Sequence, residues 1–295
     1  MKIGIAGLGK MGRAISERLK ETGRSLVLWN RTPEKTKGLA HSSVEVAATP
    51  RELAAKSDVI ITILTDAPAI RSVFSATDGL LAGDVAGKLF IEMSTVRPED
   101  QIAFADMVRA KGAIYVECAV GGTTGPAKQG KLIGLVGATD HDFEQARPIL
   151  EELCRRVELI GPVGTGASMK LAINLPLAVY YEVLGEAFAL CRHLGRDEGW
   201  LIELLADTSG GPNILRARGP MIAAALKGVD PSPVSFDVDT LRKDLRTMIA
   251  EAKRRGYELP VVERVLAVYD EASDAGWGQR DGNALPRYWS TRNPA

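Results

Sequence analysis

The fold of the N-terminal half follows from residues 2–12, which read Lys2-Ile3-Gly4-Ile5-Ala6-Gly7-Leu8-Gly9-Lys10-Met11-Gly12. Residues 2–6 are short and apolar, which predicts a strand, and the apolar positions 14, 15 and 19 that follow have helical spacing. A GxGxxG turn joins the two elements. In that context Gly7 permits a tight turn, Gly9 lets the backbone approach a pyrophosphate, and Gly12 lets the helix pack closely on the strand.

Strand and helix patterns alternate through this half of the chain. Further apolar runs predict strands at residues 26–29, 59–64, 89–93 and 113–116, with helix-sized segments between them. This alternation predicts an α/β domain of the Rossmann type, with a mostly parallel, doubly wound sheet and helices on both faces.

The C-terminal half has helical patterns. A long apolar segment covers residues 167–193, and shorter helices are predicted near residues 200–205, 220–226, 241–254 and 261–272. We therefore expect an NADP-binding domain over residues 1–162 and an all-α substrate and dimerisation domain over residues 163–295, with a long interdomain helix.

Composition excludes several functions. Lys plus Arg and Asp plus Glu both number 37, and no long run of one sign would follow a phosphate backbone, so nucleic acid is not an expected partner. Cys118, Cys154 and Cys191 are far apart, which fits reduced thiols in a cytoplasmic protein and predicts no metal site. No signal-length apolar stretch follows Met1, and glycines and Pro176 interrupt residues 159–181, so we expect no membrane span.

The end of the second predicted strand bears on which dinucleotide binds. NAD sites usually have an Asp or Glu there for the ribose 2′-hydroxyl, whereas this chain has Asn30-Arg31-Thr32. Arg31 can pair with a 2′-phosphate, and Asn30 and Thr32 can add neutral hydrogen bonds. The residues favour NADP(H), with NAD(H) also possible; the alternative is that Arg31 is a solvated turn residue.

Lys170 is the one charged residue in the apolar stretch 159–181, and Asn174 lies four residues on, hence on the same helix face. An apolar setting disfavours the charged amine and prepares it to exchange a proton with a substrate oxygen. The alternative is an ordinary solvated lysine, which is the usual state of a lysine on a surface helix.

Five motifs together resemble the β-hydroxyacid dehydrogenase family, which includes 3-hydroxyisobutyrate dehydrogenases, tartronate semialdehyde reductases and glyoxylate/succinic semialdehyde reductases. The resemblance covers nearly the whole chain. The motifs are Gly7–Gly12, Met93-Ser94-Thr95-Val96-Arg97-Pro98, Glu117-Cys118-Ala119-Val120-Gly121-Gly122 with Gly130-Lys131-Leu132, Gly164-Thr165-Gly166 through Lys170 and Asn174, and Phe236 with Lys243-Asp244-Leu245.

This resemblance implies an oxidoreductase that transfers a hydride between NADP(H) and a small β-hydroxy acid or semialdehyde. Lys170 matches the family's catalytic lysine, and Asn174 matches an asparagine that positions the substrate. Thr95 and Lys243 match residues near the cofactor. The cofactor-binding candidates are Gly7, Leu8, Gly9, Met11, Gly12, Asn30, Arg31, Thr32, Leu64, Thr95 and Lys243. The family also implies a homodimer or homotetramer.

The substrate loop departs from the family. The family commonly has Asp-Ala-Pro-Val-Ser-Gly-Gly, and Gly121 stands here in place of the serine. The substrate-binding candidates are therefore Gly121, Gly122 and Thr123, with Lys170 and Asn174. Either the backbone of the two glycines holds the acid, or Thr123 replaces the lost hydroxyl through a shift of the loop.

Three rivals accompany this interpretation. An imine reductase would use the same scaffold, although that branch usually replaces the catalytic lysine. A decarboxylating dehydrogenase of the 6-phosphogluconate kind typically has a larger helical domain than about 130 residues could build. A non-catalytic dinucleotide-binding sensor is the alternative from another class, and the pair Lys170 and Asn174 argues against it.

Overall fold

The computed structural model describes residues 1–37, 39, 42–208, 211–256 and 258–292, without the side chains of residues 186, 189, 190 and 192. Two compact units are present, Met1–Leu171 and Ala172–Ala295. The division falls inside helix α7 (Thr165–Cys191), which begins in the first unit. The domain boundary predicted between residues 162 and 163 precedes this helix and stays a prediction.

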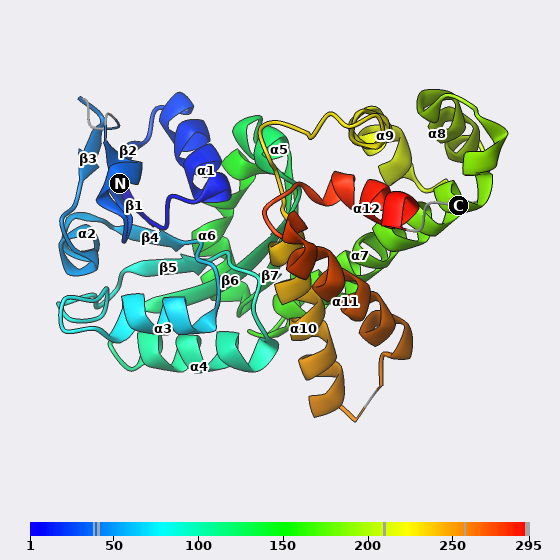
Figure 1. Ribbon diagram of the computed structural model, residues 1–295. Coiled ribbons are helices and arrows are strands. Elements are labelled where there is room, and N and C mark those ends of the chain that lie inside the picture. The colour runs from blue at the N-terminus through cyan, green and yellow to red at the C-terminus, as the bar shows by residue number, and fades with distance from the viewer. Residues whose placement is uncertain (38, 40–41, 209–210, 257, 293–295) are drawn as a thin grey trace. The chain divides into compact units, whose positions relative to one another are not determined.

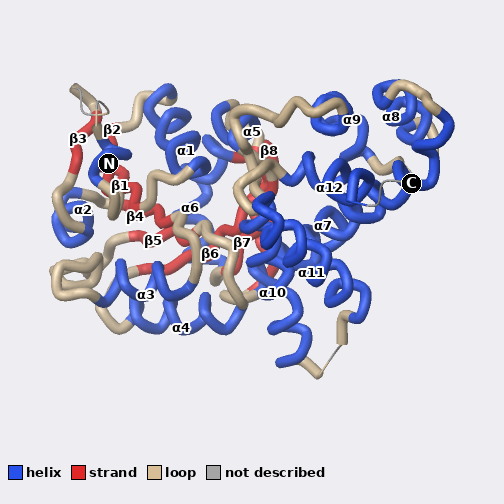
Figure 2. The backbone as a smooth tube through the Cα atoms, in the orientation of Figure 1, coloured by secondary structure: helices blue, strands red, loops and turns tan. Residues whose placement is uncertain are grey.

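The first unit is built on a sheet of eight strands over its described residues (Figures 1 and 2). The strands lie in the order β3-β2-β1-β4-β5-β6-β7-β8. All neighbours run parallel except β6 and β7, which are antiparallel. The bounds are β1 Lys2–Ala6, β2 Ser25–Trp29, β3 Val44–Val46, β4 Val59–Thr62, β5 Leu89–Glu92, β6 Ile114–Gly121, β7 Leu132–Gly137 and β8 Cys154–Gly161.

Helices cover both faces of this sheet, as the sequence predicts. Side chains of α1, α5 and α6 form one apolar core with the sheet, and side chains of α2, α3 and α4 form the other. Figure 1 shows α3 and α4 on the face opposite α1 and α6. The bounds are α1 Lys10–Glu21, η1 Pro33–Thr36, α2 Pro50–Lys56, α3 Ala67–Ser75, α4 Pro98–Arg109, α5 Thr124–Lys128 and α6 Asp140–Leu153.

The predicted strands are β1, β2, β4, β5 and β6, each beginning within one residue of its predicted start. Strands β3, β7 and β8 were not predicted. In β7, Gly134 and Gly137 resemble turn signals, but both face close neighbours. A side chain at Gly137 would collide with the Glu117 carboxylate on β6, so the glycine makes room for that buried group.

The second unit is helical over its described residues, as predicted. Besides the rest of α7 it contains η2 Arg192–Leu194, α8 Glu198–Ala206, α9 Asn213–Leu226, α10 Val238–Arg254, α11 Pro260–Ala272, the π turn η3 Ser273–Trp277, η4 Gly282–Ala284 and α12 Leu285–Arg292. Helix α12 was not predicted. The sequence pattern places the start of α9 at Pro220, but α9 begins at Asn213 and continues through that proline.

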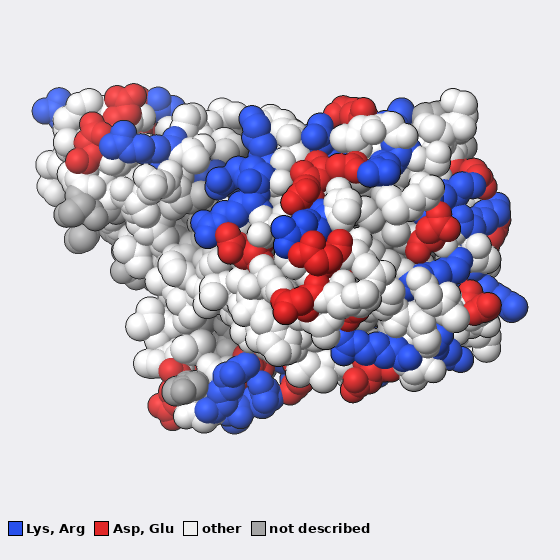
Figure 3. Space-filling model, turned by 180° about the vertical axis from the view of Figure 1, so that it is seen from behind, with Lys and Arg blue, Asp and Glu red and all other residues white. Residues whose placement is uncertain are grey.

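The surface agrees with a formal net charge of zero. On the face shown in Figure 3, Lys and Arg side chains lie interspersed with Asp and Glu. Over the part of the chain that the structure describes, no helix combines the length and apolar character needed to cross a bilayer.

Candidate functional site

Four of the predicted site segments lie at one edge of the sheet. Gly7 follows β1, Leu64 lies just beyond β4, Thr95 lies just beyond β5, and Gly121 ends β6. Strands β1, β4, β5 and β6 are parallel neighbours, so their carboxyl ends share an edge. The strand order reverses beside β1, and ligands of doubly wound sheets bind in the crevice at such a point.

The three glycines of the turn between β1 and α1 have different structural roles. Gly7 has a φ of +105°, and an added side chain would collide with the Ile63 carbonyl. A side chain at Gly12 would collide with the Gly7 carbonyl oxygen. A Cβ at Gly9, by contrast, would meet nothing within 4 Å. Packing therefore explains Gly7 and Gly12, whereas Gly9 leaves open space beside the backbone.

The start of α1 fits a dinucleotide at that open space. Gly9 is the N-cap residue, so no side chain caps the first turn, and that turn contains no acidic residue. The first N–H groups of a helix lack intrahelical partners and favour a phosphate. Met11 is partly buried against the apolar core, which fixes the helix beneath this site.

Asn30 connects the glycine turn to the end of β2. Its Oδ1 accepts a hydrogen bond from the Leu8 N–H at 2.9 Å, and its Nδ2 donates to the Thr32 carbonyl at 3.0 Å. The amide therefore orders both turns from within the protein. Arg31 and Thr32 are both exposed.

A buried carboxylate holds the turn after β5. Glu92 accepts hydrogen bonds from the hydroxyl and N–H groups of Ser94, from Gln101 Nε2 at 2.9 Å and from Thr62 Oγ1 at 3.3 Å. Burial raises the pKa of Glu92, against these hydrogen bonds, which favour its charged form. The Glu92 carboxylate thus determines where the chain leaves the strand.

Ser94 transmits this order to the neighbouring turn, because its Oγ accepts the Leu64 N–H at 2.8 Å. Leu64 and Thr95, both cofactor-binding candidates, are therefore held by one hydrogen-bonded group. Neither Glu92 nor Ser94 was among the predicted site residues. A carboxylate inside the apolar run 89–93 was the available signal, since buried acids occur almost only where they are paired.

The substrate loop keeps its strand register. Gly121 pairs with Ile133 of β7, so the antiparallel pairing of β6 and β7 extends to this residue, and Gly122 and Thr123 follow it. A Cβ at Gly121 would have its nearest neighbour at 3.6 Å, which is ordinary contact. Gly122 has a φ of +125°. The Thr123 side chain does not cap α5, which leaves its hydroxyl available to a ligand.

Lys170 and Asn174 lie one turn apart on α7. Only 8% of Lys170 is exposed, whereas its neighbour Met169 is 39% exposed. Asn174 is half-buried. The lysine is therefore among the few charged side chains that the described part of the fold buries.

Asp244 joins two of the predicted residues in the second unit. Asn174 Nδ2 donates to Asp244 Oδ2 at 3.3 Å, and Lys243 Nζ forms an ion pair with Asp244 Oδ1 at 2.6 Å. Asp244 is only 2% exposed. Asp244 belongs to the motif Lys243-Asp244-Leu245, but the sequence alone predicts no role for it. Its signal was an acid on the buried face of α10, three residues after Leu241 and four before Met248.

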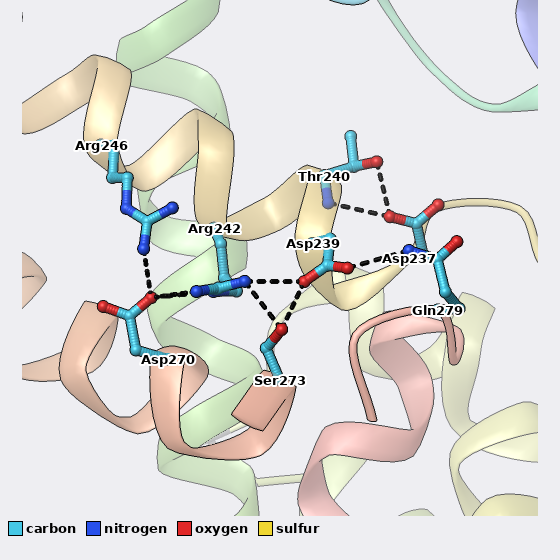
Figure 4. Close-up of polar contacts among 8 residues, drawn as sticks. All are labelled: Asp237, Asp239, Thr240, Arg242, Arg246, Asp270, Ser273 and Gln279. Atoms are coloured by element: carbon cyan, nitrogen blue, oxygen red, sulfur yellow. Dashed lines mark hydrogen bonds and ion pairs between the residues drawn. The ribbon is translucent and has the colours of Figure 1, made fainter. Parts of the chain in front are cut away.

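Figure 4 shows how α10, which carries Lys243 and Asp244, is held to α11. Arg242 donates to Asp239, Asp270 and Ser273 at 2.7–2.8 Å. Arg246 adds a second bond to Asp270. The Ser273 hydrogen bond lowers the pKa of Asp239, and Arg242 contributes in the same direction against the effect of burial. These contacts hold α10 against α11 and so fix the backbone that carries Lys243 and Asp244.

Comparison with family models divides the chain in two. Residues 2–161 match the NAD-binding domain of 6-phosphogluconate dehydrogenase. Residues 164–289 match the model described as NAD-binding of NADP-dependent 3-hydroxyisobutyrate dehydrogenase.

Individual relatives extend over nearly the full length. Glyoxylate/succinic semialdehyde reductase 1 of Arabidopsis thaliana is 30% identical over 291 residues, which is 97% of each chain. The solved 3-hydroxyisobutyrate dehydrogenase of Mycobacterium tuberculosis with L-serine has a TM-score of 0.82 at 26% identity, over 97% of each chain. A reductive aminase of Aspergillus terreus shares the fold, with a TM-score of 0.64 at 22% identity, over 98% of this chain and 99% of that one.

Proposed function

Because the chain belongs to the β-hydroxyacid dehydrogenase family, we propose that it is an NADP(H)-dependent enzyme that interconverts a small β-hydroxy acid and its semialdehyde. Oxidoreductases of this family act on CH–OH groups. The observation that carries the proposal is the burial of Lys170 on α7, one turn before Asn174. Lysine is almost never fully buried unless it is paired, so the fold holds this amine at a defined place beside Asn174.

Lys170 is the general acid and base. In reduction its Nζ donates a proton to the carbonyl oxygen, and in oxidation it accepts the proton of the hydroxyl group. Asn174 orients that oxygen through its amide, which Asp244 holds by the hydrogen bond to Nδ2. When bound, the nicotinamide supplies a hydride to the carbonyl carbon or accepts one from the carbinol carbon.

The preference for NADP(H) is supported by the end of β2. The exposed Arg31 suits a 2′-phosphate, and no carboxylate among residues 30–32 would bind the 2′-hydroxyl of NAD. The first turn of α1 and residues Leu64 and Thr95 hold the rest of the dinucleotide, and Lys243 of α10 matches the lysine that contacts the cofactor in this family.

The substrate is a small acid whose carboxylate binds at the end of β6. The N–H groups of Gly121 and Gly122 and the Thr123 hydroxyl supply the donors. Because Gly121 lacks the hydroxyl of the family's serine, the acid can differ from 3-hydroxyisobutyrate.

The test is turnover by Lys170→Ala. General acid–base assistance contributes about 10²–10⁴-fold, so kcat should fall by that factor while the Kd of NADPH stays unchanged. Lys170→Arg should be equally inactive, because arginine keeps the positive charge but does not release a proton near neutral pH. Turnover near the wild-type rate in either variant would refute the assignment.

An imine reductase on the same scaffold is less well supported, because Lys170 suits oxygen chemistry. A panel of β-hydroxy acids, semialdehydes and cyclic imines, assayed with NADPH and NADH, distinguishes the two. Reduction of imines alone would overturn the proposed reaction, and the absence of turnover with every compound despite tight NADPH binding would favour a non-catalytic sensor.

We also propose a cytoplasmic homodimer or homotetramer. An apolar row on α7 has spacings of three, four or seven residues and consists of Met169, Ile173, Pro176 and Val183. The side chains of Met169, Ile173 and Val183 are 39–50% exposed. An apolar row of this kind suits packing against a second copy. Light scattering of Ile173→Asp, which should be monomeric, tests it. Three free cysteines support the cytoplasmic location.

A further inference from the structure

Helix α7 begins without a side chain of its own to cap it. Its N-cap position is Gly164, which has a φ of +97° and carries no hydrogen-bonding group. The first turn of a helix has N–H groups without intrahelical partners, and leaving them unpaired inside a protein is costly. The cap must therefore come from elsewhere in the fold.

Glu117 of β6 supplies it. Its Oε2 accepts the Gly164 N–H at 2.5 Å, and its Oε1 accepts the Ala167 N–H in a short hydrogen bond. Glu117 is completely buried. The contact joins residues 47 and 50 positions apart in the sequence, so it connects the strand that ends in the substrate loop to the helix that carries Lys170.

The surrounding glycines make this approach possible. A side chain at Gly137 would collide with the Glu117 carboxylate, and one at Gly166 would collide with the Leu135 carbonyl of β7. Gly137 and Gly166 thus both leave room where the Glu117 carboxylate meets the first turn of α7.

The cap acts on the face of α7 that carries the chemistry. Ala167, Lys170 and Asn174 follow one another at i, i+3 and i+7, so they lie along one side of the helix. Lys170 is about 4.5 Å along the axis from Ala167, at 1.5 Å per residue. A displacement of the Ala167 backbone would therefore also displace the Lys170 amine.

We infer that Glu117 is a positioning residue, which sets the place of the Lys170 amine by holding the first turn of α7 to β6. This inference rests on the proposed role of Lys170. Glu117 touches neither substrate nor cofactor in this scheme. The pKa of Glu117 is consistent with this role. Burial raises the pKa of Glu117 to about 7, and the hydrogen bonds from the two N–H donors oppose this rise because they favour the charged carboxylate.

The experiment compares Glu117→Gln with Glu117→Asp in the full-length protein. Gln presents an NH₂ group to one of the two N–H donors, whereas Asp keeps two acceptor oxygens. Misplacement of a catalytic group by about 1 Å can cost roughly 10²-fold, so kcat of Glu117→Gln should fall by about that factor. The KM for NADPH should change by no more than about twofold, and Glu117→Asp should recover part of the loss.

Thr139→Ala is the matched control. Thr139 caps α6 in the same unit by accepting the Asp142 N–H at 3.1 Å, and α6 carries no candidate catalytic residue. This variant should lose stability without losing kcat. Wild-type kcat in folded Glu117→Gln, or an equal fall of kcat in Thr139→Ala, would overturn the inference.

Two further measurements separate the possible failures. If Lys170→Ala is inactive and Glu117→Gln is fully active, only the inference fails; if Lys170→Ala is active, the proposed function fails first. Should Glu117→Gln not fold, hydrogen exchange of the wild-type protein decides. The Gly164 and Ala167 amides should exchange as slowly as those of the central strands, and rapid exchange would contradict the cap.

Discussion

Helices α1 and α7 both begin in the first unit after glycine-rich turns, yet their first turns meet different partners. At α1, Gly9 faces open space and no side chain caps the helix. At α7, the buried carboxylate of Glu117 occupies the corresponding place. Each turn also contains a glycine that packing requires, Gly12 in one and Gly166 in the other.

The difference shows how one kind of sequence signal leads to two uses. An open helix N-terminus is available to the phosphates of a ligand, whereas one that a protein carboxylate already occupies is an internal anchor. Glycine patterns alone do not distinguish the two, because the distinguishing group at α7 comes from a strand more than forty residues away.

Among the variants that test this comparison, Gly12→Ala should cause the largest loss of stability. Its Cβ would collide with the Gly7 carbonyl oxygen, which is backbone and has little freedom to move. We expect a loss of about 3 kcal/mol or more in the free energy of unfolding, the upper end for overpacking. Denaturant unfolding measures it, with Gly9→Ala as the control that adds the same methyl group without a clash. Equal stability of the two variants would contradict the packing argument.

The pH dependence of stability tests the anchored helix. The folded-state pKa of Glu117 is about 7, above its ordinary 4.5, so the folded protein holds this proton more tightly than the unfolded chain. The resulting stabilisation is complete below pH 4.5 and is lost as the pH rises through 7, an effect of about 3 kcal/mol. Denaturant unfolding from pH 4.5 to 8 should show this decline in the wild type but not in Glu117→Gln. Parallel curves would contradict it.

Arg31→Ala tests the ligand side of the comparison. Hydrogen bonds to charged groups contribute about 1.5–3 kcal/mol, so the KM for NADPH should rise roughly 10- to 100-fold. The KM for NADH should hardly change. Lys35→Ala, at an exposed position on η1, is the control. Equal effects of Arg31→Ala on both cofactors would remove the proposed contact with the 2′-phosphate.

Gly9→Ala sharpens the same point at the helix itself. The methyl group has room within the protein, so the loss of stability should not exceed about 1 kcal/mol, the usual cost of alanine at an N-cap. It would stand where the pyrophosphate approaches the backbone, and we expect cofactor binding to weaken by about tenfold, or 1.4 kcal/mol. Titration calorimetry with NADPH measures this, and an unchanged Kd would show that the open space is not the phosphate site.

Gly121→Ser should have the smallest effect. Like Gly9, this glycine is not required by packing, because a Cβ would have its nearest neighbour at 3.6 Å. A new neutral hydrogen bond contributes about 1 kcal/mol, so kcat/KM for small β-hydroxy acids should rise by about fivefold. A fall with every acid tested would indicate that the substrate carboxylate lies elsewhere.

Much of the molecule follows from local patterns. The apolar runs of β1, β4 and β5, the glycine turn and the apolar length of α7 predict the Rossmann-type unit and the helical unit, because burial on a sheet and on a helix leaves different periods in the sequence. The exceptions have local causes too. Glycines conceal β7, Pro220 conceals the start of α9, and the three residues of β3 are too few to show a period.

The identities of Lys170, Asn174 and Arg31 as candidates also came from sequence, since a lone charge in an apolar stretch or a missing acid at a strand end is visible in one dimension. The partners of these residues were not visible. Glu117 meets α7, Ser94 links Leu64 to Glu92, and Asp244 joins Asn174 to Lys243, each across a turn or many tens of residues. Such contacts depend on which strands and helices become neighbours in the folded protein. A single hydrogen bond of about 3 Å produces no repeating pattern in the sequence, so it could not be predicted from the sequence.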